Sequence, residues 1–124
     1  MSTTAFNALR ENVRGTVIEP DDPDYESARR VYNAMADRRP AAVLRVSQTA
    51  DVIAAVRFAR EAGLPLALRG GGHSAPGFGT VDDGLVLDFS GRRGVWVDPR
   101  AKRARAEAGA TWGDYNHATH AFGL

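Results

Sequence analysis

The chain carries the stretch LPLALRGGGHS at residues 64–74, in which an apolar run leads directly into three consecutive glycines. Glycine has no Cβ and adopts positive φ without strain, so successive backbone N–H groups can turn toward a single anion. Arg69 and Ser74 add further donors, and His73 presents a nucleophilic imidazole at the end of the triplet. This combination predicts a loop that binds a phosphate-bearing cofactor and can react with it.

A strand–helix–strand unit precedes the glycine triplet. Residues 42–46 form an apolar run typical of a buried strand, and Thr49 is placed to cap a helix that Gly63 ends in a left-handed turn. One face of this helix carries Val52, Ala55, Val56 and Ala59. The second strand is the run at 64–68, so we expect two parallel strands, adjacent or nearly so. The glycine loop then leaves their carboxyl edge, where α/β sheets bind ligands.

Two other phosphate-binding motifs have similar spacing and are excluded. Residues 72–77 have the glycine spacing of a P-loop, but Phe78 stands where that motif requires its lysine. Residues 70–75 fit the Rossmann fingerprint, and Asp88 lies near the position of its ribose-binding acid. The glycines and the proline at 76–79 leave no room for the helix that a Rossmann fold needs next.

The N-terminal residues are expected to form a loose or lightly packed leader, a short strand and a helix. Residues 1–12 are polar and aperiodic, and a short strand is predicted within residues 13–18. A helix is predicted from Pro23 to Met35, with Asp22 as its N-cap. We therefore divide the chain into residues 1–35, with a leader, a strand and a helix, and residues 36–124, the main unit.

Three more strands and a final helix are predicted after the glycine loop. The strands are expected at residues 85–89, 95–97 and 104–108, and alternating alanines and charges in the third predict one buried face. A capping box formed by Thr111 and Asp114 opens the helix. Four aromatic residues are expected in the core, namely Trp96, Trp112, Tyr115 and Phe122. The predicted class is α+β, with one βαβ unit followed by further short strands and a C-terminal helix.

Composition narrows the range of functions. The chain has 124 residues, a formal net charge of +1 and no cysteine, so disulfides and thiolate chemistry are excluded. The balanced charge argues against nucleic acid as a partner, and no apolar run approaches the length of a membrane span. His117 and His120 share a helix face but lack further metal ligands, so no metal site is predicted. A cytoplasmic location is expected because no signal peptide is recognised.

The glycine stretch, with Gly77-Phe78-Gly79 after it, resembles the FAD-binding PCMH-type domain of the vanillyl-alcohol oxidase superfamily. The similarity runs from about residue 17 to 124 and is greatest to the bacterial berberine-bridge-enzyme-like FAD-linked oxidoreductases. The helix at 49–61 is similar to the family's "ADV…AV.FA.E" helix, and residues 85–90 to its "LVLDLS"-like strand. Residues 107–122 resemble its "aGatwgd…at…G" segment.

The resemblance implies that the backbone of this loop binds the pyrophosphate of FAD. The cofactor-binding residues that it implies are Arg69, Gly70, Gly71, Gly72, His73, Ser74 and Gly77. His73 would bond covalently to the 8α-methyl carbon of the flavin, and Gly79 is a weaker candidate for contact with it. No residue of the chain is implied to be catalytic.

The resemblance also implies an incomplete fold, because the family extends well beyond the segment matched by this chain. The whole protein would be a flavin-dependent oxidoreductase that oxidises a small alcohol, sugar or amine-type substrate by hydride transfer to FAD. The alternative is a non-catalytic remnant that binds a nucleotide or nothing. That alternative predicts apolar surface exposed on the sheet.

Overall fold

The computed structural model describes residues 3–31, 37–70 and 79–124. Its centre is a four-stranded sheet in the order β1-β2-β4-β3, made of β1 (Thr16–Ile18), β2 (Ala42–Arg45), β4 (Leu85–Asp88) and β3 (Leu66–Arg69). Strands β2, β4 and β3 are parallel, and β1 runs antiparallel to β2. The predicted parallel pair is therefore confirmed, with β4 inserted between its two members.

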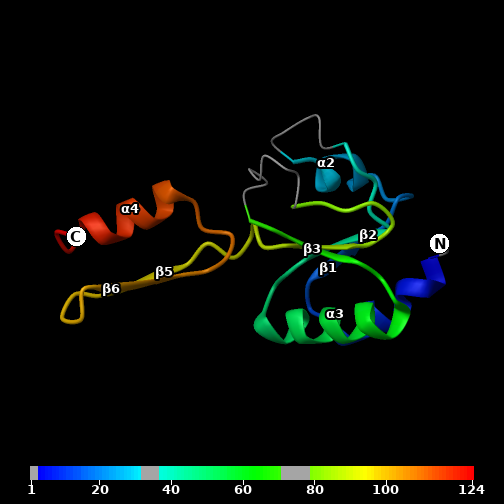
Figure 1. The fold of residues 1–124 in the computed structure, drawn as a ribbon, viewed down its shortest axis with the longest axis horizontal. Helices are drawn as coiled ribbons and strands as arrows, with labels where there is room; N and C mark the ends of the chain where they lie inside the picture. The colour runs from blue at the N-terminus through cyan, green and yellow to red at the C-terminus, as the bar shows by residue number, and fades with distance from the viewer. Residues whose placement is uncertain (1–2, 32–36, 71–78) are drawn as a thin grey trace.

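Helix α3 (Thr49–Ala62) connects β2 to β3 and covers one face of the sheet (Figure 1). Its N-cap is Gln48, one residue earlier than predicted. The boundary moves because the Asp51 carboxylate accepts the backbone N–H groups of Ser47 and Gln48, at 2.9 and 3.3 Å. Gly63 ends the helix as expected, with a φ of 68° that favours glycine.

The two faces of the sheet bury separate apolar clusters. On the α3 face, Ala55 and Ala59 pack over Leu44, Leu85 and other strand residues. The first helical segments, η1 (Thr3–Phe6) and α1 (Asn7–Asn12), complete that cluster. On the opposite face, Val43 and Val86 pack against Tyr25 and Ala28 of α2 (Tyr25–Arg29). Figure 1 shows α2 on the side of the sheet away from α3. The burial of both faces explains the continuous apolar runs in β2 and β4.

The prediction of a helix from Pro23 to Met35 was wrong at its start and in its length. Helix α2 begins at Tyr25, and Arg30 has extended backbone, with ψ of 143°. The Asp22 carboxylate accepts the N–H of Glu19 at 2.8 Å instead of capping a helix. Because the Asp22 carboxylate is hydrogen-bonded within this local turn, it does not cap the helix. The end predicted at Met35 lies outside the described residues.

The last third of the described chain extends away from the sheet (Figure 1). Strands β5 (Val95–Asp98) and β6 (Arg103–Ala106) form an antiparallel hairpin, and α4 (Trp112–His120) follows it. The predicted capping box is present, because the Asp114 carboxylate accepts the N–H of Thr111 at 2.9 Å and the Thr111 hydroxyl accepts that of Asp114 at 3.2 Å.

The prediction of a buried aromatic core in this part was wrong. Trp96, Trp112 and Phe122 are 54%, 78% and 54% exposed, although Thr119 is buried. The predicted buried face of the second hairpin strand is also absent, because Ala106 and Ala108 are exposed. A two-stranded hairpin and one short helix form too thin a unit to enclose such side chains.

Candidate functional site

Three charged residues lie side by side at the carboxyl edge of the parallel strands. Arg45, Asp88 and Arg69 are the last residues of β2, β4 and β3, and the strand register pairs Asp88 with both arginines. The preceding strand residues are almost all apolar, so charge is concentrated at this edge. In open α/β sheets, ligands bind beyond this edge of the strands.

A hollow of about 330 Å³ opens at the same edge, between the strand ends and α2. Its lining residues come from the strand ends and from the region of α2: Arg45, Arg69, Gly70, Asp88, Ser90, Ser27, Ala28, Arg30 and Val31. The sequence prediction placed Arg69 and Gly70 here and missed Arg30 and Arg45. Arg45 is the one charged residue in the predicted strand at 42–46 and lies next to its end, and this position was the signal that could have identified it.

The hollow has an excess of positive charge. Arg69 forms an ion pair with Asp88, whereas neither Arg30 nor Arg45 forms an ion pair with any residue in the described ranges. Both of these arginines are exposed at the mouth of the hollow. Guanidinium groups bind phosphate oxygens by paired hydrogen bonds, so this donor set suits a phosphate-bearing ligand.

Gly70 follows β3 where the chain enters the hollow. A Cβ at this position would lie 2.6 Å from the carbonyl oxygen of Ala108, closer than real Cβ atoms come to backbone. The backbone therefore passes the Ala108 segment at a distance that only glycine permits. The other predicted site residues, Gly71, Gly72, His73, Ser74 and Gly77, lie outside the described residues.

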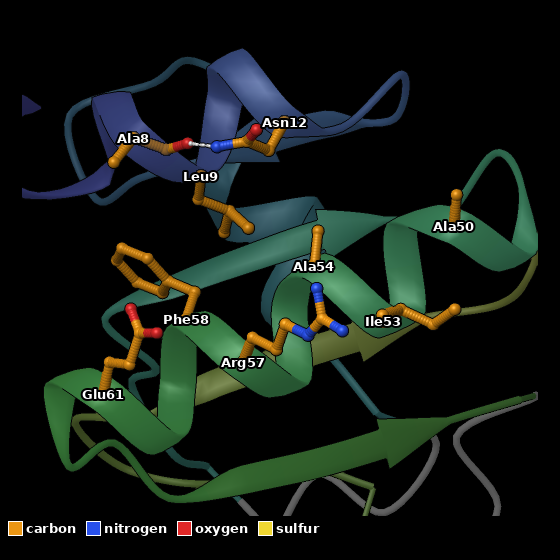
Figure 2. A pocket seen from close by; sticks show the side chains of 9 residues that line it. All are labelled: Ala8, Leu9, Asn12, Ala50, Ile53, Ala54, Arg57, Phe58 and Glu61. Carbon is orange, nitrogen blue, oxygen red and sulfur yellow. Dashed lines mark hydrogen bonds between the residues drawn. The ribbon is translucent and has the colours of Figure 1, made fainter.

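A second hollow, of about 390 Å³, lies between α1 and α3 (Figure 2). Its polar groups do not converge on a centre, since the Asn12 amide donates to the carbonyl of Ala8 at 2.7 Å. Leu9 and Phe58 contribute apolar surface between the helices. None of the charged strand-end residues lines this hollow, and its lining has no arrangement that indicates catalysis.

Metal binding is not supported by the described part of the chain, which contains no cluster of three metal-ligating side chains. His117 and His120 are exposed on α4. Within the same ranges, none of the helices is long and apolar enough to span a membrane.

Comparison with known proteins gives the family. Residues 40–124, more than half of the chain, match a model described as FAD binding domain. The chain belongs to the FAD-binding domain family. The matched segment contains β2, β4 and β3 and therefore the whole charged edge.

Relatives of this FAD-binding domain are FAD-linked oxidoreductases. The chain is 33% identical to (R)-6-hydroxynicotine oxidase of Paenarthrobacter nicotinovorans over 91% of its own length and 25% of the relative's. It is 33% identical to the uncharacterised FAD-linked oxidoreductase YgaK of Bacillus subtilis, over 93% of this chain and 26% of that protein. The chain therefore spans about a quarter of these relatives.

Solved structures show the same fold. The crystal structure of 6-hydroxy-D-nicotine oxidase from Arthrobacter nicotinovorans matches with a TM-score of 0.84 at 32% identity, over 90% of this chain and 24% of that one. A variant of the berberine-bridge-enzyme-like protein 1 of Physcomitrella patens also matches with a TM-score of 0.84, at 29% identity, over 93% of this chain and 25% of that one. The predicted α+β FAD-binding PCMH-type fold and the berberine-bridge-enzyme-like relationship are confirmed, and the cofactor of this family is FAD.

Proposed function

We propose that this chain is the flavin-binding part of an oxidoreductase that oxidises a small alcohol, sugar or amine-type substrate. The observation that carries the proposal is the position of Arg69 and Gly70 at the charged carboxyl edge, inside the segment that matches the FAD-binding family. When bound, FAD supplies an acceptor for hydride. Among the candidate substrates, the name of the 6-hydroxynicotine oxidase relative favours an amine.

The binding residues that we propose are those implied by the family pattern. Gly70, Gly71 and Gly72 would turn backbone N–H groups toward the pyrophosphate, and Ser74 would donate from the same loop. Arg69 would contribute through its backbone at the end of β3, and Gly77 would allow the backbone to approach the flavin. A cytoplasmic location is also part of the proposal and rests on the sequence.

His73 is the proposed covalent attachment point for the flavin. A bond from its imidazole nitrogen to the 8α-methyl carbon would replace one C–H bond of that methyl and the imidazole N–H, the flavin itself would take up the two electrons released, and dioxygen would then reoxidise it. A neutral imidazole is nucleophilic near pH 7, since its ordinary pKa is about 6.5. The test is to incubate the chain with FAD and precipitate it in acid. We expect yellow colour to stay with the pellet of the wild type and of His120→Ala, a control at an exposed histidine, and to be lost with His73→Ala. Colour that washes out of the wild type would overturn the covalent link.

A second candidate function is FAD binding without turnover. The exposed apolar side chains of Leu68 and Trp112 favour it, since they mark surface that a larger enzyme would cover. The two functions are separated by adding amines, alcohols and sugars to the flavin-loaded chain without oxygen. Bleaching of the visible flavin absorbance supports oxidation, and an unchanged spectrum with every substrate class supports binding alone.

A further inference from the structure

Arg69 and Asp88 form an ion pair across neighbouring strands. Nη2 of Arg69 lies 2.9 Å from Oδ2 of Asp88, and the two side chains are only 8% and 6% exposed. The pair is formed by the two last residues of β3 and β4, which are register partners. Buried charges are stable only when paired and hydrogen-bonded, so neither residue can leave the other without a large cost.

Further hydrogen bonds hold both partners in place. Arg69 Nη1 donates to the carbonyl of Arg30 at 3.2 Å, and the Asp88 carboxylate accepts the N–H of Ser90 at 2.9 Å. The carbonyl of Arg69 also accepts the N–H of Phe89 at 2.9 Å. The side chain and the backbone of Arg69 are thus both fixed at the residue before Gly70. The guanidinium is neutralised and its orientation is set by other parts of the protein.

Arg45 stands on the other side of Asp88 and has the opposite properties. It is the register partner of Asp88 in β2, lines the same hollow and is exposed. It forms no ion pair with any described residue, so its charge is not compensated within that part of the protein. An exposed guanidinium beside a neutral buried pair can meet an incoming anion, and Arg45, unlike Arg30, lies in the same strand row as Asp88 and Arg69.

We propose that these three residues divide two tasks at the FAD site, an inference that rests on the proposed function. Asp88 is a positioning residue: through its ion pair with Arg69 it fixes the backbone at Gly70, where the glycine triplet begins. Arg45 supplies the positive charge that the cofactor phosphates meet. Arg69 acts as a scaffold and does not bind phosphate with its guanidinium.

The experiment measures the affinity of reversible FAD binding, by quenching of flavin fluorescence, in the His73→Ala background. The variants are Asp88→Asn, Asp88→Glu, Arg69→Gln, Arg45→Gln and the pair Arg69→Gln with Asp88→Asn. Arg57→Gln, an exposed arginine on α3, is the matched control for loss of one positive charge. ADP and riboflavin serve as separate probes for the phosphate-bearing half and the flavin half.

Arg45→Gln is expected to weaken FAD and ADP binding about tenfold and to make the affinity less sensitive to salt, because one screened attraction is lost. Riboflavin binding should not change. Asp88→Asn should weaken FAD binding at least fivefold while the salt sensitivity stays that of the parent, and Asp88→Glu should restore part of the affinity. The double variant should bind better than Asp88→Asn, since it removes the unpaired buried charge.

Other outcomes would overturn the inference. If Arg69 bound phosphate directly, Asp88→Asn would release its charge and strengthen binding, and Arg69→Gln would reduce the salt sensitivity. An effect of Arg45→Gln equal to that of Arg57→Gln would remove Arg45 from the site. Melting curves show which variants fail to fold. If Asp88→Asn does not fold, the FAD affinities of Asp88→Glu and Arg45→Gln, compared with the parent, still test the inference. Failure of both the wild type and the His73→Ala parent to bind FAD would instead contradict the proposed function.

Discussion

Asp51 and Gly15 are joined by a hydrogen bond of 2.9 Å, from the backbone N–H of Gly15 to the Asp51 carboxylate. The same carboxylate accepts the N–H of Arg14 at 2.8 Å and those of Ser47 and Gln48, and it is fully buried. One side chain at the first turn of α3 therefore ties the segment before β1 to the segment after β2. The contact joins residues that are 36 positions apart in the sequence.

Replacing this carboxylate should destabilise the whole sheet. Asp51→Asn places an NH2 group among backbone donors, so the hydrogen bonds to the replaced oxygen are lost and the remaining ones are no longer charge-assisted. We expect the free energy of unfolding to fall by roughly 2 to 4 kcal/mol, the range for losing charge-assisted hydrogen bonds in a buried site. Urea unfolding followed by circular dichroism measures this. The exposed Asp21→Asn is the control and should be nearly neutral; an equal loss in both variants would contradict the assigned role.

Asp51 should also make stability depend on pH. Burial raises the pKa of Asp51, but the N–H groups of Arg14, Ser47, Gly15 and Gln48 lower it more, and the pKa lies below its ordinary value of 3.8. The unfolded chain therefore binds this proton more readily than the folded chain. The stabilisation is complete above about pH 4 and is lost as the pH falls through the lowered pKa. Urea unfolding at a series of pH values should show a steeper loss below about pH 4 in wild type than in Asp51→Asn. Parallel curves for the two proteins would refute the prediction.

The close approach of Gly70 to Ala108 gives a third prediction. A methyl group at Gly70 would overlap the Ala108 carbonyl oxygen at 2.6 Å. The oxygen belongs to backbone and the methyl is fixed directly to backbone, so neither can move independently. Gly70→Ala should cost about 1 to 3 kcal/mol of stability and weaken FAD binding, since the strand end must shift. Gly91 has open space around it, so Gly91→Ala is the matched control and should change neither property. Thermal melting and FAD titration report the two effects, and wild-type FAD affinity in a folded Gly70→Ala variant would be evidence against this site.

The sequence contains enough information to predict the elements around the glycine triplet. The apolar run at 42–46, the helical face of Ala55 and Ala59, and the turn at Gly63 are local patterns, and each was confirmed. The family was also recognisable from residues 64–74, because that motif has strict spacing. Local chemistry therefore located the carboxyl edge of the sheet, at which we propose that FAD binds.

The contacts between these elements were not predictable, because they depend on which strands become neighbours. The Arg69–Asp88 pair exists because β4 inserts between β2 and β3, an order that no local pattern specifies. The hydrogen bonds of Asp51 to Arg14 and Gly15 are equally non-local. The exposure of Trp112 depends on how many layers surround α4, and amphipathic spacing does not report that number.

The outer strand of the sheet leads to the last prediction. Leu66 and Leu68 on β3 are 37% and 62% exposed, and their register partners Leu85 and Leu87 are buried on the α3 face. Among the described strands β3 pairs with β4 alone, so it combines exposed leucines with an open hydrogen-bonding edge. The 124-residue chain should therefore self-associate as its concentration rises. Leu68→Lys should suppress this association, because a charge on an edge strand opposes pairing, and should change stability by less than about 0.5 kcal/mol.

Ile53→Lys is the matched control for this edge, since Ile53 is 52% exposed on α3 and away from β3. Sedimentation velocity over a range of concentrations gives the association state of wild type and of both variants. Association that Leu68→Lys abolishes and Ile53→Lys leaves intact assigns the contact to β3. If both lysine variants suppress association equally, general surface hydrophobicity is the cause. A wild type that remains monomeric at every concentration would contradict the prediction.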